Sequence, residues 1–181
     1  MNLNKRKMKL STKLMASAVA AVALFLSTNV NAQESRKFGI GLSVGIPTTD
    51  LYSVAIGADA RMQFDVTKRL SVPVAAGYNH YVAKDDVSNL PDYGYIPVKT
   101  GLKYFFAPSG SGLYAMGEIG AAFGVTNNAK TTFLYAPTLG YSWSNGLDLG
   151  VRYENTGKGV NIAGAPEMGQ VALRIAYGFK L

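Results

Sequence analysis

His80 is the only histidine of the 181-residue chain, which contains no cysteine. A histidine is the usual general base of a hydrolase, and such an enzyme would pair it with a serine nucleophile. No serine lies two residues from His80, where a neighbour on the same face of a strand would lie, and Ser88 belongs to the segment that follows. We therefore predict no catalytic residue and expect His80 to be an ordinary polar residue near the end of a strand.

Carboxylates gather after this histidine, where Asp85, Asp86 and Asp92 offer the oxygen ligands that a divalent cation prefers. A solvated acidic loop has the same composition, and we adopt that interpretation. The closely spaced Gly39 and Gly41 lack the strand–turn–helix setting of a phosphate-binding loop. With no Cys/His cluster in the sequence, we predict neither a metal site nor a cofactor.

Nine charged residues lie in segments that otherwise consist mainly of apolar and small residues. Their five cations and four carboxylates nearly cancel, and we expect all nine to face a confined interior. An unpaired charge buried there costs several kcal/mol, so these charges must pair with one another or contact water. We predict a structural network, not a proton path, a catalytic cluster or a conducting pore, formed by Asp59, Arg61, Lys99, Lys103, Glu118, Asp148, Arg152, Glu154 and Arg174.

The segments that position these charges show the two-residue period of β-strands. In the last segment, Val171, Leu173 and Ile175 alternate with Ala172 and Arg174. An even number of such strands closes a sheet without an open edge, as hydrocarbon requires. Segments of about ten residues also suit strands that cross a bilayer at a tilt. The pattern occurs in eight segments: residues 38–46, 54–64, 70–79, 96–106, 113–124, 133–143, 147–154 and 171–181.

Short turns and longer loops alternate between these segments. We therefore predict an all-β fold, an eight-stranded antiparallel up-and-down transmembrane β-barrel with the longer loops on the outer rim. The short turns are expected at residues 66–69, 107–112 and 144–146, and the other connections at 47–53, 83–94, 126–130 and 155–166.

Three prolines fall inside the predicted strands, where a proline removes a ladder hydrogen bond. We expect Pro73 and Pro97 near the rims, where this loss is small. Pro137 falls in the middle of its segment. We therefore predict a bulge or a shortened sixth strand at Pro137.

The same alternation suits a soluble lipocalin-like carrier, whose apolar face lines a cavity. Two features favour a membrane barrel instead. The second face is rich in glycine, alanine and serine, which fit the cramped interior of an eight-stranded barrel. Aromatic residues also collect near both ends of the apolar face, as in the girdles of membrane barrels. They are Phe38, Phe64, Phe106, Trp143 and Phe179 near one rim, and Tyr78, Phe123, Phe133 and Tyr153 near the other.

Residues 1–32 have the three parts of a secretory signal peptide. Five Lys and Arg precede an apolar run over residues 14–26, and Val30 and Ala32 are the small residues of a cleavage site. The run is too short to span a bilayer. The chain's net charge of +7 falls to +2 without these five cations, so no nucleic-acid partner is expected. Residues 33–181 then form one domain.

Residues 36–181 resemble the small eight-stranded outer-membrane β-barrels of Gram-negative bacteria, the OmpX-like and OmpA-like porin-type family. The resemblance is sharpest at the C-terminus, where Tyr177, Phe179 and Leu181 are similar to the strand signal recognised by the barrel-assembly machinery. That signal usually ends in an aromatic residue, whereas this chain ends in leucine. The resemblance implies a monomer of the cell outer membrane, surrounded by lipid and lipopolysaccharide, with loops available for adhesion or binding.

A structural or surface-interaction role is the function we expect from this resemblance. Some barrels of this size modify lipid A, so an outer-membrane enzyme that uses His80 is the first alternative. The soluble carrier is the second.

Overall fold

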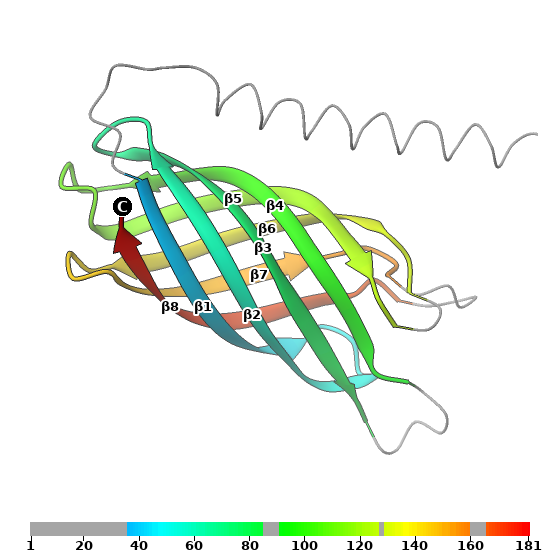
Figure 1. Cartoon of the computed structure of the whole chain (residues 1–181). Coiled ribbons are helices and arrows are strands. Elements are labelled where there is room, and N and C mark those ends of the chain that lie inside the picture. The colour runs from blue at the N-terminus through cyan, green and yellow to red at the C-terminus, as the bar shows by residue number, and fades with distance from the viewer. Residues whose placement is uncertain (1–35, 85–90, 127–128, 160–165) are drawn as a thin grey trace, which may run out of the picture. The chain divides into compact units, whose positions relative to one another are not determined.

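The computed structural model describes residues 36–84, 91–126, 129–159 and 166–181. The leader predicted over residues 1–32 lies outside these ranges. Within the described residues, no helix is long and apolar enough to cross a membrane. Eight strands are formed (Figure 1): β1 (Arg36–Pro47), β2 (Tyr52–Asp65), β3 (Leu70–Ala83), β4 (Tyr93–Phe105), β5 (Gly112–Gly124), β6 (Thr132–Ser142), β7 (Leu147–Asn155) and β8 (Gly169–Lys180).

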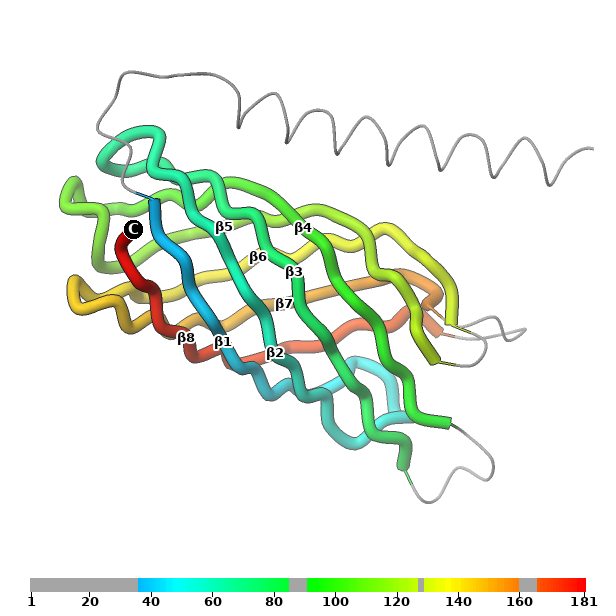
Figure 2. Tube along the Cα trace, in the orientation of Figure 1, coloured from blue at the N-terminus to red at the C-terminus, as the bar shows by residue number. Residues whose placement is uncertain are grey.

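Each strand pairs antiparallel with the next, and β8 pairs with β1, so the sheet closes into a barrel (Figure 2). Phe38 of β1 illustrates the closure, because it lies opposite Met62 of β2 on one side and Phe179 of β8 on the other. Closure leaves no strand edge with unpaired backbone groups. The predicted eight-stranded up-and-down barrel is confirmed.

The two ends of the barrel differ. One end, the short-turn rim, carries the turns at residues 66–69, 106–111 and 143–146 together with both Arg36 and Leu181. The amide of Leu181 donates to the carbonyl of Arg36 at 2.9 Å, which ties the last residue to the first strand. The opposite end, the long-loop rim, carries the described residues 48–51, 84, 91–92, 125–126, 129–131, 156–159 and 166–168.

Side chains alternate across the barrel wall with the apolar residues outside. Leu42, Ile46 and Leu139 are 64%, 75% and 66% exposed, whereas the inward Arg61 and Glu118 are only 5% and 1% exposed. A water-soluble protein has the opposite distribution, with large aliphatic residues inside and charges outside. The barrel therefore has an apolar exterior and a polar interior.

Pro137 does not cause the predicted bulge. It lies opposite Gly117 of β5 in an unbroken register, and the register between β6 and β7 is the same before and after it. β6 has 11 residues, fewer than the 13 of β5 but more than the 9 of β7. The expectation of a bulge is therefore wrong, because a proline can lose one hydrogen bond without adding a residue to its strand.

At each of the three prolines, two consecutive residue pairs are missing from the hydrogen-bond ladder on one side of the strand. On the β7 side of β6 the ladder is missing at Pro137, which has no N–H to donate to the carbonyl of Tyr153 opposite it. Pro73 and Pro97 interrupt the β3–β4 ladder in the same way. All three prolines keep their other neighbouring strand paired, so the closed sheet tolerates them.

Candidate functional site

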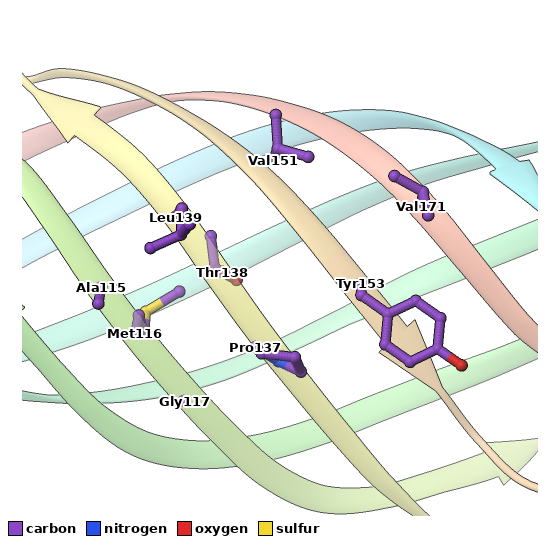
Figure 3. A pocket seen from close by; sticks show the side chains of 9 residues that line it. All are labelled: Ala115, Met116, Gly117, Pro137, Thr138, Leu139, Val151, Tyr153 and Val171. Carbon is purple, nitrogen blue, oxygen red and sulfur yellow. The ribbon is translucent and has the colours of Figure 1, made fainter.

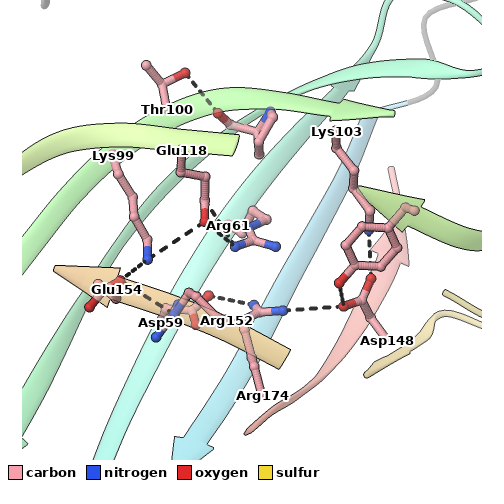
Figure 4. Close-up of polar contacts among 12 residues, drawn as sticks. Asp59, Arg61, Lys99, Thr100, Lys103, Glu118, Asp148, Arg152, Glu154 and Arg174 are labelled. Carbon is pink, nitrogen blue, oxygen red and sulfur yellow. Dashed lines mark hydrogen bonds and ion pairs between the residues drawn. The ribbon is translucent and has the colours of Figure 1, made fainter. Parts of the chain in front are cut away.

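The lumen holds all nine charged residues that the sequence singled out, contributed by β2, β4, β5, β7 and β8 (Figure 4). All of them except Asp59 are buried, and the Asp59 side chain itself is only 7% exposed. Small residues make room for them: a Cβ added at Gly41 would lie 2.5 Å from Nη2 of Arg174, and one at Gly150 would lie 2.9 Å from the Tyr114 hydroxyl. Glycine on the inner face therefore gives space to long polar side chains from other strands.

A chain of ion pairs crosses the lumen from β2 to β7. Nη2 of Arg61 donates to Oε1 of Glu118 at 3.1 Å. Nζ of Lys99 lies between two carboxylates, 3.7 Å from Oε2 of Glu118 and 2.6 Å from Oε2 of Glu154. The ion pairs of this chain join residues that are 19 to 57 positions apart in the sequence.

Glu154 is the most heavily hydrogen-bonded carboxylate of the lumen. In addition to Lys99, its Oε1 accepts from the Tyr95 hydroxyl at 2.6 Å and from Nδ2 of Asn79 at 3.0 Å. Nε of Arg152 lies 3.5 Å from its Oε2, within ion-pair distance but without a hydrogen bond from that nitrogen. Glu154 is completely buried, and these donors replace the water that its charge would otherwise require.

A second group of pairs lies nearer the short-turn rim. Nε of Arg174 donates to Oδ2 of Asp59 at 2.7 Å, and Nζ of Lys103 donates to Oδ2 of Asp148 at 2.6 Å. The Tyr114 hydroxyl donates to the other oxygen of Asp148 at 2.8 Å, and Lys103 lies 3.9 Å from the centre of the Tyr114 ring. Charge pairing and cation–π contact together stabilise the Lys103 ammonium group in a site without free water contact.

Aromatic side chains fill the rest of the lumen, and the sequence analysis missed them. Tyr81 and Tyr95 lie in one buried cluster with two further tyrosines, Tyr52 and Tyr93, while Phe105 forms a second cluster with Tyr114 and Met116. On β4, Tyr93, Tyr95 and Phe105 have the same parity as Lys99 and Lys103, and that shared parity was the signal that would have found them. Tyr52 has the opposite parity to the inward charges of β2, because the register shifts after it. We had expected the inner face to be mainly small residues.

His80 lies on the outer wall near the long-loop rim and contacts two side chains. Its Nδ1 is 3.2 Å from the Tyr78 hydroxyl, and its Nε2 is 3.1 Å from Oδ2 of Asp92. The other oxygen of Asp92 accepts from the Ala83 amide at 2.9 Å, so Asp92 also holds the end of β3. Ser88 lies outside the described residues. The hydroxyl of Tyr78, the imidazole of His80 and the carboxylate of Asp92 thus form a hydrogen-bonded row. In some enzymes a hydroxyl, a base and an orienting carboxylate in this order activate a nucleophile.

The acidic loop is only partly described, because Asp85 and Asp86 lie outside the described residues. Asp92, its third carboxylate, is engaged with His80 and the Ala83 amide. Within the described part of the chain, no group of three His, Cys, Asp or Glu residues is placed to hold a metal ion.

The outer wall is hollowed between β5 and β8 (Figure 3). At the centre lie Gly117, where an added Cβ would meet nothing within 4 Å, and Pro137 opposite it. The hollow has a volume of about 560 Å³ and is lined by Ala115, Met116, Gly117, Pro137, Thr138, Leu139, Val151, Tyr153 and Val171. Its lining is almost entirely apolar, as expected of a surface that contacts hydrocarbon.

The C-terminal strand places Tyr177 and Phe179 on the outer wall, with their ring centres 4.9 Å apart. Leu181 is 74% exposed at the short-turn rim. Two similar pairs lie near the same rim, Tyr104 with Phe106 and Tyr141 with Trp143. Three of the five aromatic residues expected at this end, Phe106, Trp143 and Phe179, therefore each lie beside a tyrosine at the ends of β4, β6 and β8.

Comparison with known proteins shows the fold and not the family. A scan of protein families finds no match, and no curated protein matches the sequence. Among solved structures, the chain is similar to Ail, the attachment invasion locus protein of Yersinia pestis, with a TM-score of 0.57 and 16% identity over 82% of this chain and 100% of that one. The N-terminal β-barrel domain of Pseudomonas aeruginosa OprF gives a TM-score of 0.50 and 13% identity over 81% and 100%.

A designed transmembrane β-barrel is also similar, with a TM-score of 0.51 and 19% identity over 79% of this chain and 95% of the design. The three structures share few residues with this chain, so the agreement lies in the arrangement of strands. The chain therefore has the fold of the small eight-stranded outer-membrane β-barrels.

Proposed function

We propose that this chain is an integral protein of the bacterial outer membrane that acts as a closed, non-enzymatic anchor for surface loops. One observation carries the proposal: large aliphatic side chains cover the outer wall, while arginine, lysine and glutamate are buried in the lumen. In water this arrangement would expose a continuous apolar surface around the whole barrel, far larger than the patches that soluble monomers tolerate.

The aromatic residues support the same location. Tyr104 and Phe106, Tyr141 and Trp143, and Tyr177 and Phe179 form exposed pairs on alternate strands near the short-turn rim. Tyrosine and tryptophan favour the boundary between hydrocarbon and head groups. The short-turn rim then faces the periplasm and the long-loop rim faces the outside, in contact with lipopolysaccharide.

Export and insertion follow from the two ends of the chain. Residues 1–32 act as a cleaved signal peptide, and the mature domain is residues 33–181. Tyr177, Phe179 and Leu181 serve as the strand signal for the barrel-assembly machinery. The mature barrel is a monomer, because its closed sheet offers no edge for a second copy.

Fractionation tests the membrane location directly. The protein should sediment with outer membranes and resist extraction by alkaline carbonate. A detergent extract should migrate faster on an electrophoresis gel before boiling than after it, because a folded barrel is compact. Recovery in the soluble periplasmic fraction, with one mobility before and after boiling, would overturn the proposal and favour the lipocalin-like carrier.

The filled lumen supports a closed barrel and not a pore. Lys99, Glu154 and Arg152 occupy its centre, and the tyrosine cluster that includes Tyr81 and Tyr95 lies on the side of the long-loop rim. We expect purified protein in planar lipid bilayers to give no stable current steps in about 1 M potassium chloride. Long-lived, ohmic steps would contradict a closed lumen.

The loops of the long-loop rim are the part of the molecule available for recognition. Lys130 and Lys158 are exposed there. The similar fold of Ail has been solved in complex with sucrose octasulfate, a heparin analogue. We therefore choose immobilised heparin as the first probe: wild type should be retained more strongly than a Lys130→Gln/Lys158→Gln variant, and equal elution of the two proteins would argue against recognition of sulfated glycans by this rim.

A second function is favoured by one observation, the contact of His80 with both Tyr78 and Asp92. These groups lie on the outer wall, where a lipid head group would reach them, and an enzyme that modifies lipid A would need a base at this depth. A His80→Ala variant and a matched His80→Gln variant should be compared with wild type by mass spectrometry of lipid A. A changed profile in both variants would support the enzyme, and an unchanged profile would remove it.

A further inference from the structure

The charged residues of the lumen do not balance. Among the residues that the structure describes, five cations and four carboxylates face it, and the pair of Lys37 with Asp65 at the short-turn rim, 3.0 Å apart, is neutral. Four cations have a carboxylate as a hydrogen-bond partner: Arg61 with Glu118, Lys99 with Glu154, Lys103 with Asp148 and Arg174 with Asp59. The lumen therefore carries one positive charge more than its carboxylates compensate.

Arg152 is the cation left over. It is 2% exposed, and its only ion pair among the described residues is the 3.5 Å approach of Nε to Oε2 of Glu154, which Lys99 already binds at 2.6 Å (Figure 4). Nε of Arg152 has no hydrogen-bond partner within the described chain. Arg61 also has an unpartnered Nε, but its Nη2 contacts both oxygens of Glu118 at 3.1 and 3.3 Å.

A second unpartnered polar group lies next to Arg152. Thr138 is directly opposite it in the β6–β7 register, and its side chain also faces the lumen. Thr138 is 4% exposed, and its Oγ1 has no hydrogen-bond partner within the described residues. Directly opposed side chains on neighbouring strands lie about 5 Å apart at their Cβ atoms, close enough to share one small ligand.

We propose that the lumen holds one small monovalent anion, a halide such as chloride, bound between the guanidinium group of Arg152 and the hydroxyl of Thr138. A water molecule would satisfy the two unpartnered atoms, but it would leave the extra charge buried without a counter-charge, which is unfavourable. A halide accepts hydrogen bonds from both donors and also cancels the charge. This site rests on the lumen geometry alone and does not depend on a surface or enzymatic role.

Bromide is the probe, because it resembles chloride and scatters X-rays anomalously. Folded protein in detergent is prepared in sodium gluconate, and sodium bromide replaces gluconate at constant ionic strength. Unfolding by urea is followed through Trp143, the only tryptophan of the chain. A ligand that binds only the folded state lowers the unfolding equilibrium constant about ten-fold when its concentration is about ten times its dissociation constant.

Three variants separate this site from general salt effects. Arg152→Gln removes the excess charge and should abolish the bromide response. Thr138→Val removes one donor and should raise the bromide dissociation constant about ten-fold. Lys180→Gln removes an exposed cation at the end of β8 and should respond as wild type does. A response that is absent from wild type, or that persists in Arg152→Gln, would overturn the proposal.

Crystals grown in bromide give a readout that does not depend on the stability of any variant. The proposal predicts a bromine anomalous peak within hydrogen-bond distance of both Arg152 and Thr138. If only ordinary water density is found between these residues, the proposal is wrong, even if Arg152→Gln fails to fold.

Discussion

Asp59 and Arg174 show how single residues fix the interior of this barrel. They come from the second and last strands, 115 positions apart in sequence, and are joined by two hydrogen bonds, one of 2.7 Å from Nε of Arg174. The side chains of Arg174 and Asp59 are only 3% and 7% exposed. Loss of one member of a buried pair therefore matters more than the pair itself contributes.

We predict that Arg174→Gln destabilises the barrel by about 3–5 kcal/mol, because Asp59 is left buried without its cation. The double variant Asp59→Asn/Arg174→Gln should recover most of that loss, since two neutral amides replace two charges. The free energies of unfolding in urea of these two variants, of Asp59→Asn alone and of wild type complete a double-mutant cycle. If the double variant were no more stable than Arg174→Gln, the ion pair would not be the cause.

Two neighbouring glycines give a matched test of the two faces of the wall. A Cβ at Gly101 would collide with the backbone carbonyl of Gly117 across the β4–β5 ladder, whereas a Cβ at Gly117 itself would point into open space. We expect Gly101→Ala to cost about 1–3 kcal/mol of stability and Gly117→Ala to be nearly neutral. Equal effects of the two substitutions would contradict a close approach between Gly101 and the carbonyl of Gly117.

Strands β3 and β4 show what the sequence could and could not predict. The apolar alternation predicted strands over residues 70–79 and 96–106, but they run over Leu70–Ala83 and Tyr93–Phe105. The extra residues near the long-loop rim include Tyr81 and Tyr93, large residues that face the lumen and obscure the contrast between the two faces. The number of strands could be predicted by counting the alternating segments, and the direction of each face because lipid contact requires an apolar outer wall.

The pairing of lumen charges could not be predicted in the same way. Arg61 pairs with Glu118 although 57 positions separate them, and the strands of these two residues, β2 and β5, do not adjoin. Such contacts cross the barrel and depend on strand tilt and register, which alternation in the sequence does not encode. The two-residue period therefore shows which side chains face inward but not which of them meet.

Pro137 gives a prediction at the scale of one strand. Pro137→Val would supply the N–H that the β6–β7 ladder lacks, opposite the carbonyl of Tyr153. The gain of one hydrogen bond, about 1 kcal/mol, is offset in part by the greater freedom of the unfolded chain without proline. Hydrogen exchange is thus the sharper measurement: the new amide at position 137 should be as protected as its neighbours in β6. If this amide exchanged as fast as one in an exposed loop, it would not be bonded to the Tyr153 carbonyl, and the missing N–H of Pro137 would not explain the gap in this ladder.

At the scale of the whole molecule, the barrel has apolar residues on its surface and charged residues in its interior, the reverse of a water-soluble protein. The described outer wall carries Ile40, Leu42, Leu139 and Leu173, all about half exposed or more, and the lumen carries the ion pairs. A closed sheet satisfies its own backbone, so hydrocarbon can contact it everywhere. Stability then depends on the bilayer as solvent.

The central claim is that hydrocarbon contacts this outer wall, and site-directed spin labelling tests it most directly. The natural chain has no cysteine, so Leu42→Cys, Leu139→Cys and Leu173→Cys each carry a single nitroxide, with Lys68→Cys in a short turn as the aqueous control. In lipid vesicles, the three wall positions should collide more often with oxygen than with a water-soluble nickel complex, and the control should show the reverse. Frequent collision of the nickel complex with all three wall positions would contradict the account.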